Sequence, residues 1–341
     1  MQTPHILNKY RSAIDAELKS LLAPYRLPLY DMMRYHLGWI DERGKEVAEI
    51  SGKALRPTLC LMSCEAAGRD YMPAMPAAAA VELIHNFSLI HDDIQDDDAE
   101  RRHRPTVWKV WGKPQAINAG SAMCVLAGLS LSRARDDGLD LEKYERLLTI
   151  LNRATLKLIE GQYLDIQYER TFDIDVDDYL TMIRGKTAAL ISCSMETGAL
   201  IGTDDPVKTE QFRELGENLG IAFQIRDDIL GIWGDAKATG KPKGSDIKRK
   251  KKTLPIVYAL SSGSGGVKDT IVEIFQKDNI GENDAKTVFD LLFKADAYAH
   301  VQEMVRDYGE KSERLIHAIG MEQRCMDNFE QIVEFLTDRD Y

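Results

Sequence analysis

One segment of the chain is almost entirely apolar for about four helical turns and then ends in carboxylates. Between Ala77 and Ile90 the only charged residue is Glu82, and a helix of this composition is buried over most of its surface. The segment runs directly into HDDIQDDDAERRHR at 91–104. The sequence therefore predicts a buried helix with negative charge at its carboxyl end. The apolar residues that follow the helical period are Leu83, Phe87, Ile90 and Ile94.

Three aspartates follow this segment at helical spacing. Asp92 and Asp96 lie four residues apart, which places them on one face of a helix with Asp93 beside them. Buried carboxylates are costly unless cations compensate their charge. Mg²⁺ fits this pattern, because it accepts a few carboxylates and takes its other oxygens from water or phosphate. An isolated acidic run is more often a solvated patch, and an EF-hand is excluded by the missing glycine and spacing.

A second segment repeats the arrangement and favours a metal site. From Asn218 to Trp233 the only charged residues are Arg226, Asp227 and Asp228, and GKPKGSDIKRKKK follows at 240–252. Two apolar helices that each end in an aspartate pair and a basic stretch are difficult to explain as surface charge. We predict that two facing helices hold Mg²⁺ ions, with a polyphosphate bridging the ions and basic residues binding its other oxygens.

Composition narrows the class of protein. Hydrophobic residues make up 44% and charged residues 29% of the 341 residues, as in globular proteins with a full core. No apolar run reaches the roughly 20 residues of a membrane span, and no signal peptide is evident, so we expect a cytoplasmic protein without an integral membrane segment. The net charge of −11 argues against nucleic acid as a partner. Five cysteines without a CxxC pair fit reduced thiols better than disulfides.

Helical periods and the scarcity of strand-like alternation predict an all-α fold. A second period of this kind is Phe212, Leu215, Leu219 and Phe223. We expect a single domain over residues 1–341. Loops are predicted at 68–73, 104–114, 136–140, 202–206, 238–246 and 261–266, and the last is interpreted as a surface loop rather than a linker between domains.

Six motifs between Gly52 and Pro255 resemble, in order, those of the trans-isoprenyl diphosphate synthases, the polyprenyl synthetase family. They are GKALRP (52–57), the apolar helix with His85, DDIQD (92–96) followed by RR, GKT (185–187), FQIRDD (223–228) and GKPKGSDIKRKKKTLP (240–255). The resemblance implies the isoprenoid synthase fold, an antiparallel helix bundle around a central cavity, and a homodimer. The pattern is most similar to bacterial-type geranylgeranyl diphosphate synthases.

The resemblance also implies a role for each motif. About three Mg²⁺ ions would be bound by Asp92, Asp93, Asp96, Asp227 and Asp228. The allylic diphosphate would be contacted by Lys186, a catalytic residue, together with Arg101 and Lys241, and Lys251 matches a nearby basic position. The pocket for isopentenyl diphosphate would contain Lys53, Arg56, His85 and Arg102. The polar residues near the reacting carbons would be Thr187 and Gln224.

The implied reaction joins isopentenyl diphosphate to dimethylallyl, geranyl or farnesyl diphosphate. Metal ions and basic residues stabilise the departing diphosphate, the double bond attacks the allylic cation, and the released diphosphate accepts the proton. Phe87 and Ser88 stand five and four residues before Asp92. One aromatic followed by a small residue is similar to synthases of the C20 product, geranylgeranyl diphosphate. Farnesyl diphosphate (C15) is the alternative, followed by longer products, and Ile84 and Met123 are further candidates for the cavity floor.

Two positions depart from the family's pattern, and other protein classes stay open. The second motif often has a third aspartate where this chain has Gly231, with Asp235 one turn further, so we infer that Asp227 is the essential ligand. The residue after the arginine pair is usually glycine but here is His103. The rivals are a class I terpene cyclase, a non-catalytic subunit of a heteromeric synthase, and a phosphate- or Mg²⁺-binding module. GKALRP, Arg102 and FQIRDD argue against the cyclase, and the intact first motif argues against the subunit.

Overall fold

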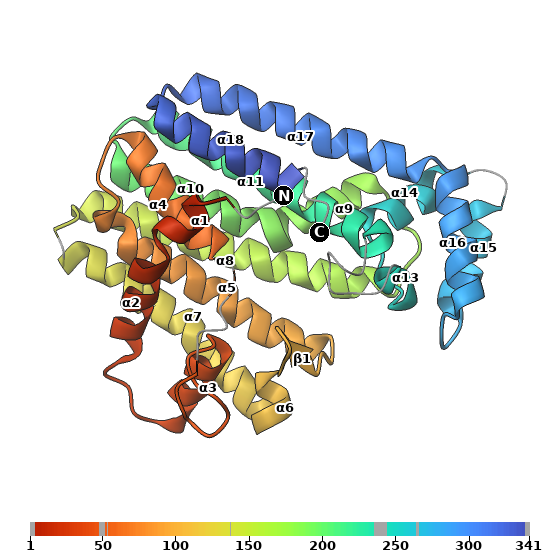
Figure 1. Ribbon diagram of the computed structural model, residues 1–341, viewed down its shortest axis with the longest axis horizontal. Helices are drawn as coiled ribbons and strands as arrows, with labels where there is room; N and C mark the ends of the chain where they lie inside the picture. Colours follow the sequence, from red (N-terminus) through yellow and green to blue (C-terminus); the bar gives the residue numbers. More distant parts are fainter. Residues whose placement is uncertain are drawn as a thin grey trace. The chain divides into compact units, whose positions relative to one another are not determined.

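The computed structural model describes residues 4–47, 52, 54–136, 138–234, 244–263 and 266–337. Helices dominate these residues, which confirms the prediction of an all-α chain, and the strands described form one short pair (Figure 1). No helix in these ranges is both long and apolar enough to cross a membrane.

The elements follow one another along the chain with short connections. Up to the second aspartate motif they are α1 (Ile6–Lys9), α2 (Arg11–Leu22), α3 (Pro28–His36), α4 (Leu55–Ala67), η1 (Met72–Ala74), α5 (Met75–Gln95), β1 (Glu100–Arg101), β2 (Arg104–Pro105), α6 (Val107–Trp111), α7 (Lys113–Asp136), α8 (Leu141–Tyr168), α9 (Val176–Ile183), η2 (Arg184–Ala188), α10 (Ala189–Gly202) and α11 (Pro206–Trp233). After it come α13 (Ser245–Lys248), α14 (Leu254–Ser262), α15 (Val267–Gln276), α16 (Glu282–Lys294), α17 (Ala297–Ile319) and α18 (Gln323–Thr337).

The chain divides into two compact units, and each is described by itself. The α5 unit consists of His5–Arg153 and Cys193–Glu210, and the α11 unit is built mainly from Ala154–Ser192 and Gln211–Tyr341. Helices α8, α10 and α11 contribute residues to both. One aspartate motif lies in each unit. That the chain is a single domain, and that the two motifs face each other, stay predictions.

Helix α5 is the centre of the α5 unit. Its side chains from Ala77 to Val81 are at most 1% exposed, and it packs against α2, α4 and α7. Small residues let backbones approach closely here: a Cβ added to Gly198 of α10 would lie 2.0 Å from the carbonyl oxygen of Cys60 in α4. Burial raises the pKa of the Cys60 and Cys64 thiols to about 12, so both stay protonated and act as packing groups. All five cysteines are free.

Two clusters of buried apolar side chains stabilise the α11 unit. One contains Ile232 and Ile247 and extends along α14, α15 and α16. The other contains Ile225 and Leu254 and joins α9, α11, α14 and α17. Helices α17 and α18 lie side by side and antiparallel in this unit (Figure 1). Because each buried Ile or Leu contributes about 1.5–3 kcal/mol, these clusters fix the end of α11 that carries the second aspartate motif.

Most of the predicted loops are confirmed, but the prediction of a loop at 104–114 is wrong. Helices end and restart around 68–73, 136–140, 202–206 and 261–266, whereas 104–114 contains β2, α6 and the start of α7. Tertiary contacts explain α6: the Thr106 hydroxyl and the Trp108 indole nitrogen both donate to the Asp98 carbonyl oxygen, each at 2.9 Å. The loop predicted at 238–246 lies outside the described residues up to 243, and Ser245 already begins α13.

Candidate active site

The first aspartate motif occupies the last turn of α5. Asp96 closes the helix, and its backbone N–H donates to the Asp92 carbonyl oxygen at 2.8 Å. Asp93 is buried, Asp92 is half-buried and Asp96 is exposed. The exposure of the three residues thus increases from Asp93 through Asp92 to Asp96. Asp92 and Asp96 lie on one helix face.

Asp93 is held by an arginine from the short strand pair. Its Oδ1 accepts a hydrogen bond from Arg101 Nε at 2.7 Å, and the carboxylate is 1% exposed. Oδ2 is buried and has no hydrogen-bond partner among the described residues. Burial raises the pKa of Asp93 to about 6, although Arg101 opposes the shift. A buried carboxylate oxygen of this kind fits a second cation, since a cation beside it would return the group to its charged form.

No three acidic, histidine or cysteine side chains within the described ranges are already arranged around one point as a metal centre. The aspartates of each motif would therefore hold Mg²⁺ only with further oxygens from substrate or water, as is usual for this ion.

A two-residue turn presents the arginine pair. Arg101 pairs with Arg104 across β1 and β2, and the turn residues Arg102 and His103 have φ values of 53° and 60°. A two-residue hairpin turn of type I′ requires positive φ at both positions, which glycine or asparagine adopts most easily. The usual glycine at position 103 thus has a structural reason, and His103 occupies a strained backbone conformation in this chain.

The predicted isopentenyl pocket is partly assembled around a neutral histidine. Arg56 Nη1 lies 3.2 Å from His85 Nε2. Burial, and then the charge of Arg56 and Arg102, holds the pKa of His85 well below its usual value. A guanidinium can only donate, so Nε2 accepts this hydrogen bond and the imidazole proton sits on Nδ1. The Arg102 guanidinium packs against Gly52, where a Cβ would lie 2.7 Å from Nη2.

Two further polar residues of this region were not predicted as site residues. Asn86 Nδ2 donates to the Glu82 carbonyl oxygen at 2.8 Å and to Glu82 Oε1 at 3.0 Å. Burial raises the pKa of Glu82, and the charges of Arg56 and Arg102 oppose that shift. The signal was present in the sequence, because a lone charge inside an apolar helix needs a buried partner.

The predicted chain-length residues lie on α5 one turn before the first motif. Phe87 is 6% exposed and its ring meets the His91 ring edge-on at 5.2 Å. The Ser88 hydroxyl donates to the His85 carbonyl oxygen at 2.8 Å, so its own helix satisfies it. Helix α7 approaches closely here, since a Cβ on Gly120 would lie 2.5 Å from the His91 ring.

In the second motif the two neighbouring aspartates have different surroundings. Asp228 is 4% exposed. Its Oδ2 accepts from the Tyr179 hydroxyl and, at 3.1 Å, from the Leu254 backbone N–H at the start of α14. Its Oδ1 accepts from Gln224 Nε2 at 3.2 Å. Burial raises the pKa of Asp228 to about 7 against these hydrogen bonds, which lower it. Asp227, the next residue round the helix, is half-buried.

The two residues predicted near the reacting carbons are brought together. The Thr187 hydroxyl donates to Gln224 Oε1 at 2.8 Å, and Gln224 in turn donates to Asp228. Thr187, Gln224, Asp228 and Tyr179 therefore form one continuous hydrogen-bonded chain that links η2, α11 and α9. Tyr179 was not predicted, and nothing around it in the sequence marks it.

The GKT motif lies in a single π-helical turn, η2, a form that is common at functional sites. Lys186 pairs there with Asp165 of α8. Glycine makes this approach possible: a Cβ on Gly161 would lie 2.1 Å from the Lys186 nitrogen, and one on Gly185 would lie 2.7 Å from the Lys157 carbonyl oxygen. Asp165 is a second residue that was not predicted.

The basic stretch after the second motif is divided between structural and exposed lysines. Lys251 is exposed, whereas Lys252 donates to the carbonyl oxygens of Tyr168 and Glu169 at 2.7 Å each and lies 4.2 Å from the Phe172 ring centre. Burial lowers the pKa of Lys252 to about 8. The sites predicted at Lys53 and Lys241, and the additional Asp235, lie outside the described residues.

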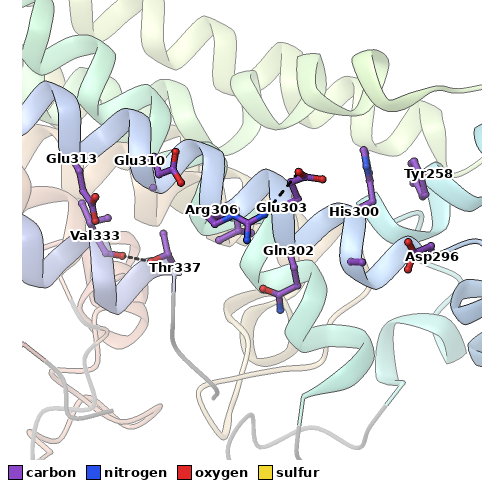
Figure 2. A pocket seen from close by; sticks show the side chains of 13 residues that line it. Tyr258, Asp296, His300, Gln302, Glu303, Arg306, Glu310, Glu313, Val333 and Thr337 are labelled. Atoms are coloured by element: carbon purple, nitrogen blue, oxygen red, sulfur yellow. Dashed lines mark hydrogen bonds and ion pairs between the residues drawn. The ribbon is translucent and has the colours of Figure 1, made fainter.

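A cavity of about 740 Å³ opens along α17 in the α11 unit, and Figure 2 shows the side chains that line it. None of the predicted site residues is among them. Its charged residues are mostly acidic, including Asp296, Glu303 and Glu310, and its one arginine, Arg306, lies 3.9 Å from Glu303. A surface with this charge disfavours a diphosphate.

Comparisons with known proteins agree with the motifs. Residues 38–292 match the polyprenyl synthetase family. The chain is 36% identical over 328 residues to the (2E,6E)-farnesyl diphosphate synthase of Mycobacterium tuberculosis, covering 95% of this chain and 89% of that protein. It is 42% identical over 259 residues to the geranylgeranyl diphosphate synthase of the same organism, covering 76% of this chain and 73% of that protein.

Solved structures give the same result. A polyprenyl synthetase from Streptomyces coelicolor A3(2) is similar at a TM-score of 0.90 and 34% identity, over 97% of this chain and 98% of that one. A geranylgeranyl pyrophosphate synthase from Corynebacterium glutamicum, complexed with isoprenyl diphosphate and magnesium, is similar at a TM-score of 0.83 and 26% identity, over 98% of this chain and 99% of that one.

Proposed function

Because the chain belongs to the polyprenyl synthetase family and is a trans-isoprenyl diphosphate synthase, we propose that it condenses isopentenyl diphosphate with allylic diphosphates to give geranylgeranyl diphosphate. The single observation that supports the C20 product is the pair Phe87 and Ser88, one aromatic and one small residue, a turn before Asp92 on α5. Relatives of both product classes are similar to the chain, so farnesyl diphosphate is the alternative.

The family depends on Mg²⁺, and when bound the ion supplies positive charge that stabilises the leaving diphosphate. We assign its binding to Asp92, Asp93, Asp96 and Asp227, with about three ions per site as the resemblance implies. Asp228 was also predicted as a ligand, but three protein donors engage its oxygens. That arrangement favours a role in holding α11 against α9 and α14.

The remaining residues act on the two substrates. Arg101 and Lys186 contact the allylic diphosphate, whose C–O bond breaks with the electron pair leaving on oxygen. Arg56 and neutral His85 hold isopentenyl diphosphate, whose double bond attacks the allylic carbon before a proton leaves to form the new trans double bond. The hydrogen-bonded pair Thr187 and Gln224 fixes polar atoms near the reacting carbons, where fixed dipoles stabilise developing charge without reorganising.

We also propose a homodimer. Helix α7 exposes Ile117, Val125 and Leu129 on one face, and α8 exposes Leu156, Ile159 and Tyr163 on one face. Large apolar side chains at helical spacing on a surface indicate a protein interface. Analytical ultracentrifugation of the parent and of Val125→Lys tests this, and a monomeric parent contradicts it.

Product analysis tests the proposed function. The purified chain is incubated with Mg²⁺, labelled isopentenyl diphosphate and, separately, C5, C10 and C15 allylic diphosphates, and the dephosphorylated products are sized by mass spectrometry. A discrete C20 alcohol supports the proposal, and a C15 alcohol supports the alternative. Asp92→Ala and Asp227→Ala should abolish turnover while the helical circular dichroism is kept. Near-normal turnover in both variants contradicts the metal-site assignment.

A further inference from the structure

Helix α11 lacks a side chain at the position one turn after Asp227. Gly231 lies four residues further along the helix and hence on the same face. This is also the position where related second motifs often have a further aspartate. A metal site built on Asp227 alone would have one carboxylate from this helix, because protein donors engage the oxygens of Asp228.

The space above Gly231 is filled by another carboxylate. A Cβ added to Gly231 would lie 2.0 Å from Oδ2 of Asp246, 2.6 Å from its Cγ and 3.3 Å from its Oδ1. The first two distances are shorter than real Cβ atoms show, so the Asp246 carboxylate stands where a side chain at position 231 would begin. Asp246 belongs to α13, which follows α11 in the same unit.

Several contacts hold Asp246 in this place. The backbone N–H of Gly244 donates to the Ile232 carbonyl oxygen at 3.1 Å, and the Ser245 hydroxyl approaches the Gly231 carbonyl oxygen at 3.4 Å. Ile247, the next residue, is fully buried in the same apolar cluster as Ile232. Asp246 itself is only half-buried. The segment is therefore anchored on both sides of a residue that is not closed off from solvent.

We propose that Asp246 replaces the missing aspartate of α11, so that the second divalent-cation site of this chain is formed by Asp227 and Asp246. The inference rests on the proposed function, which places a Mg²⁺ ion at Asp227. Two carboxylates, one from the helix and one from α13, restore the negative charge that Gly231 removes. Substituting Gly231 by aspartate alone would force two carboxylates into one place.

The test measures binding of Mn²⁺, a paramagnetic substitute for Mg²⁺, by electron paramagnetic resonance of the full chain with inorganic diphosphate present. Asp246→Asn should weaken the binding of one Mn²⁺ ion about 10- to 100-fold. The exchange Gly231→Asp with Asp246→Gly returns a carboxylate to the same place from the other element, and it should restore binding to within about three-fold of the parent. Asp290→Asn, an exposed acid on α16, is the matched control and should change nothing.

The outcomes separate this inference from the proposed function. Parent-like Mn²⁺ binding in Asp246→Asn, together with a loss in Asp227→Asn, overturns the role of Asp246 and leaves the metal site in place. Parent-like binding in both variants overturns the proposed second site as well. A loss in Asp246→Asn that the exchange variant does not restore shows that the packing of α13 matters rather than the carboxylate, and this also overturns the inference. If Asp246→Asn does not fold, the exchange variant alone decides: parent-like binding supports the proposal, and weak binding overturns it.

Discussion

The hydroxyl group of Tyr179 donates to Oδ2 of Asp228, and both side chains are buried inside the α11 unit. The same oxygen accepts the Leu254 N–H at the first turn of α14, where a negative charge is favoured by the helix dipole. One carboxylate thus joins α9, α11 and α14. Because the neighbouring Asp227 lies on the same backbone, the direction of its side chain depends on this junction.

Tyr179→Phe should destabilise the protein by about 1–3 kcal/mol, since it leaves a buried carboxylate without one of its donors. Chemical denaturation followed by circular dichroism measures the change. The matched control is Tyr298→Phe, which removes a hydroxyl that is hydrogen-bonded to Gln302 at an exposed position and should cost about 0.5 kcal/mol or less. Equal losses in the two variants would show that the junction at Asp228 adds no stability.

Stability of the metal-free protein should fall as the pH rises from about 4 to about 6 through the titration of Asp93. Its pKa in the folded chain is raised to about 6 from 3.8, so the folded state binds more protons than the unfolded state in this window. The ionised, buried carboxylate therefore destabilises the fold above pH 6, by an amount on the order of 3 kcal/mol.

The free energy of unfolding of the parent and of Asp93→Asn, measured by denaturation in a chelator at pH 4.5 and at pH 7, gives this contribution of Asp93. The variant should gain stability relative to the parent on going to pH 7, because asparagine does not titrate. The comparison between the two proteins cancels other titrating groups, including His36 and Asp228. A constant difference between parent and variant at both pH values contradicts the prediction.

The sequence located the aspartates because both pairs interrupt apolar helices, and a charge in such a place needs a partner. It could not supply the partners that come from distant segments. Tyr179 and Asp228 are 49 residues apart, and one tyrosine among 13 carries no local mark of its contact. Asp246 was visible only as part of a basic stretch, and its approach to Gly231 depends on how α13 folds back onto α11.

The prediction of a loop at 104–114 was wrong for a related reason. Apart from Lys109, the VWKVW stretch of this segment contains only valine and tryptophan, which have weak helix propensity, and α6 forms because Thr106 and Trp108 are anchored to Asp98. The strand pair before it was also missed, because its turn is Arg-His rather than the glycine or asparagine pairs that mark hairpins in a sequence.

His103→Gly should stabilise the protein by about 0.5–1 kcal/mol. His103 has a φ of 60°, and a side chain in this region costs about 1–2 kcal/mol, part of which is offset by the greater freedom of glycine in the unfolded chain. Thermal unfolding measures the change. His103→Ala is the control, since it removes the imidazole but keeps the Cβ, and it should show no gain. A gain of equal size in the alanine variant would mean that the imidazole, not the backbone, is the source of strain.

Phe87→Ala should shift the product to chains longer than that of the parent. Phe87 lies one turn before the first aspartate motif on α5 and is buried, as are Ile84 and Met123, and under the proposed function the removal of its ring opens space where a growing tail would stop. The complementary change, Ser88→Phe, adds a second aromatic beside it and should shorten the product to C15. Product sizes are compared with one allylic primer and a fixed ratio of substrates.

The control for Phe87→Ala has to separate a wider cavity from general loss of packing, since truncating a buried phenylalanine costs about 3–5 kcal/mol. Leu59→Ala in α4 removes a fully buried side chain from the same unit and should cost about 2–5 kcal/mol without changing product length. Longer products in both variants would indicate a loosened unit rather than a moved floor. An unchanged product in Phe87→Ala, with the protein folded and active, would place the floor at another residue.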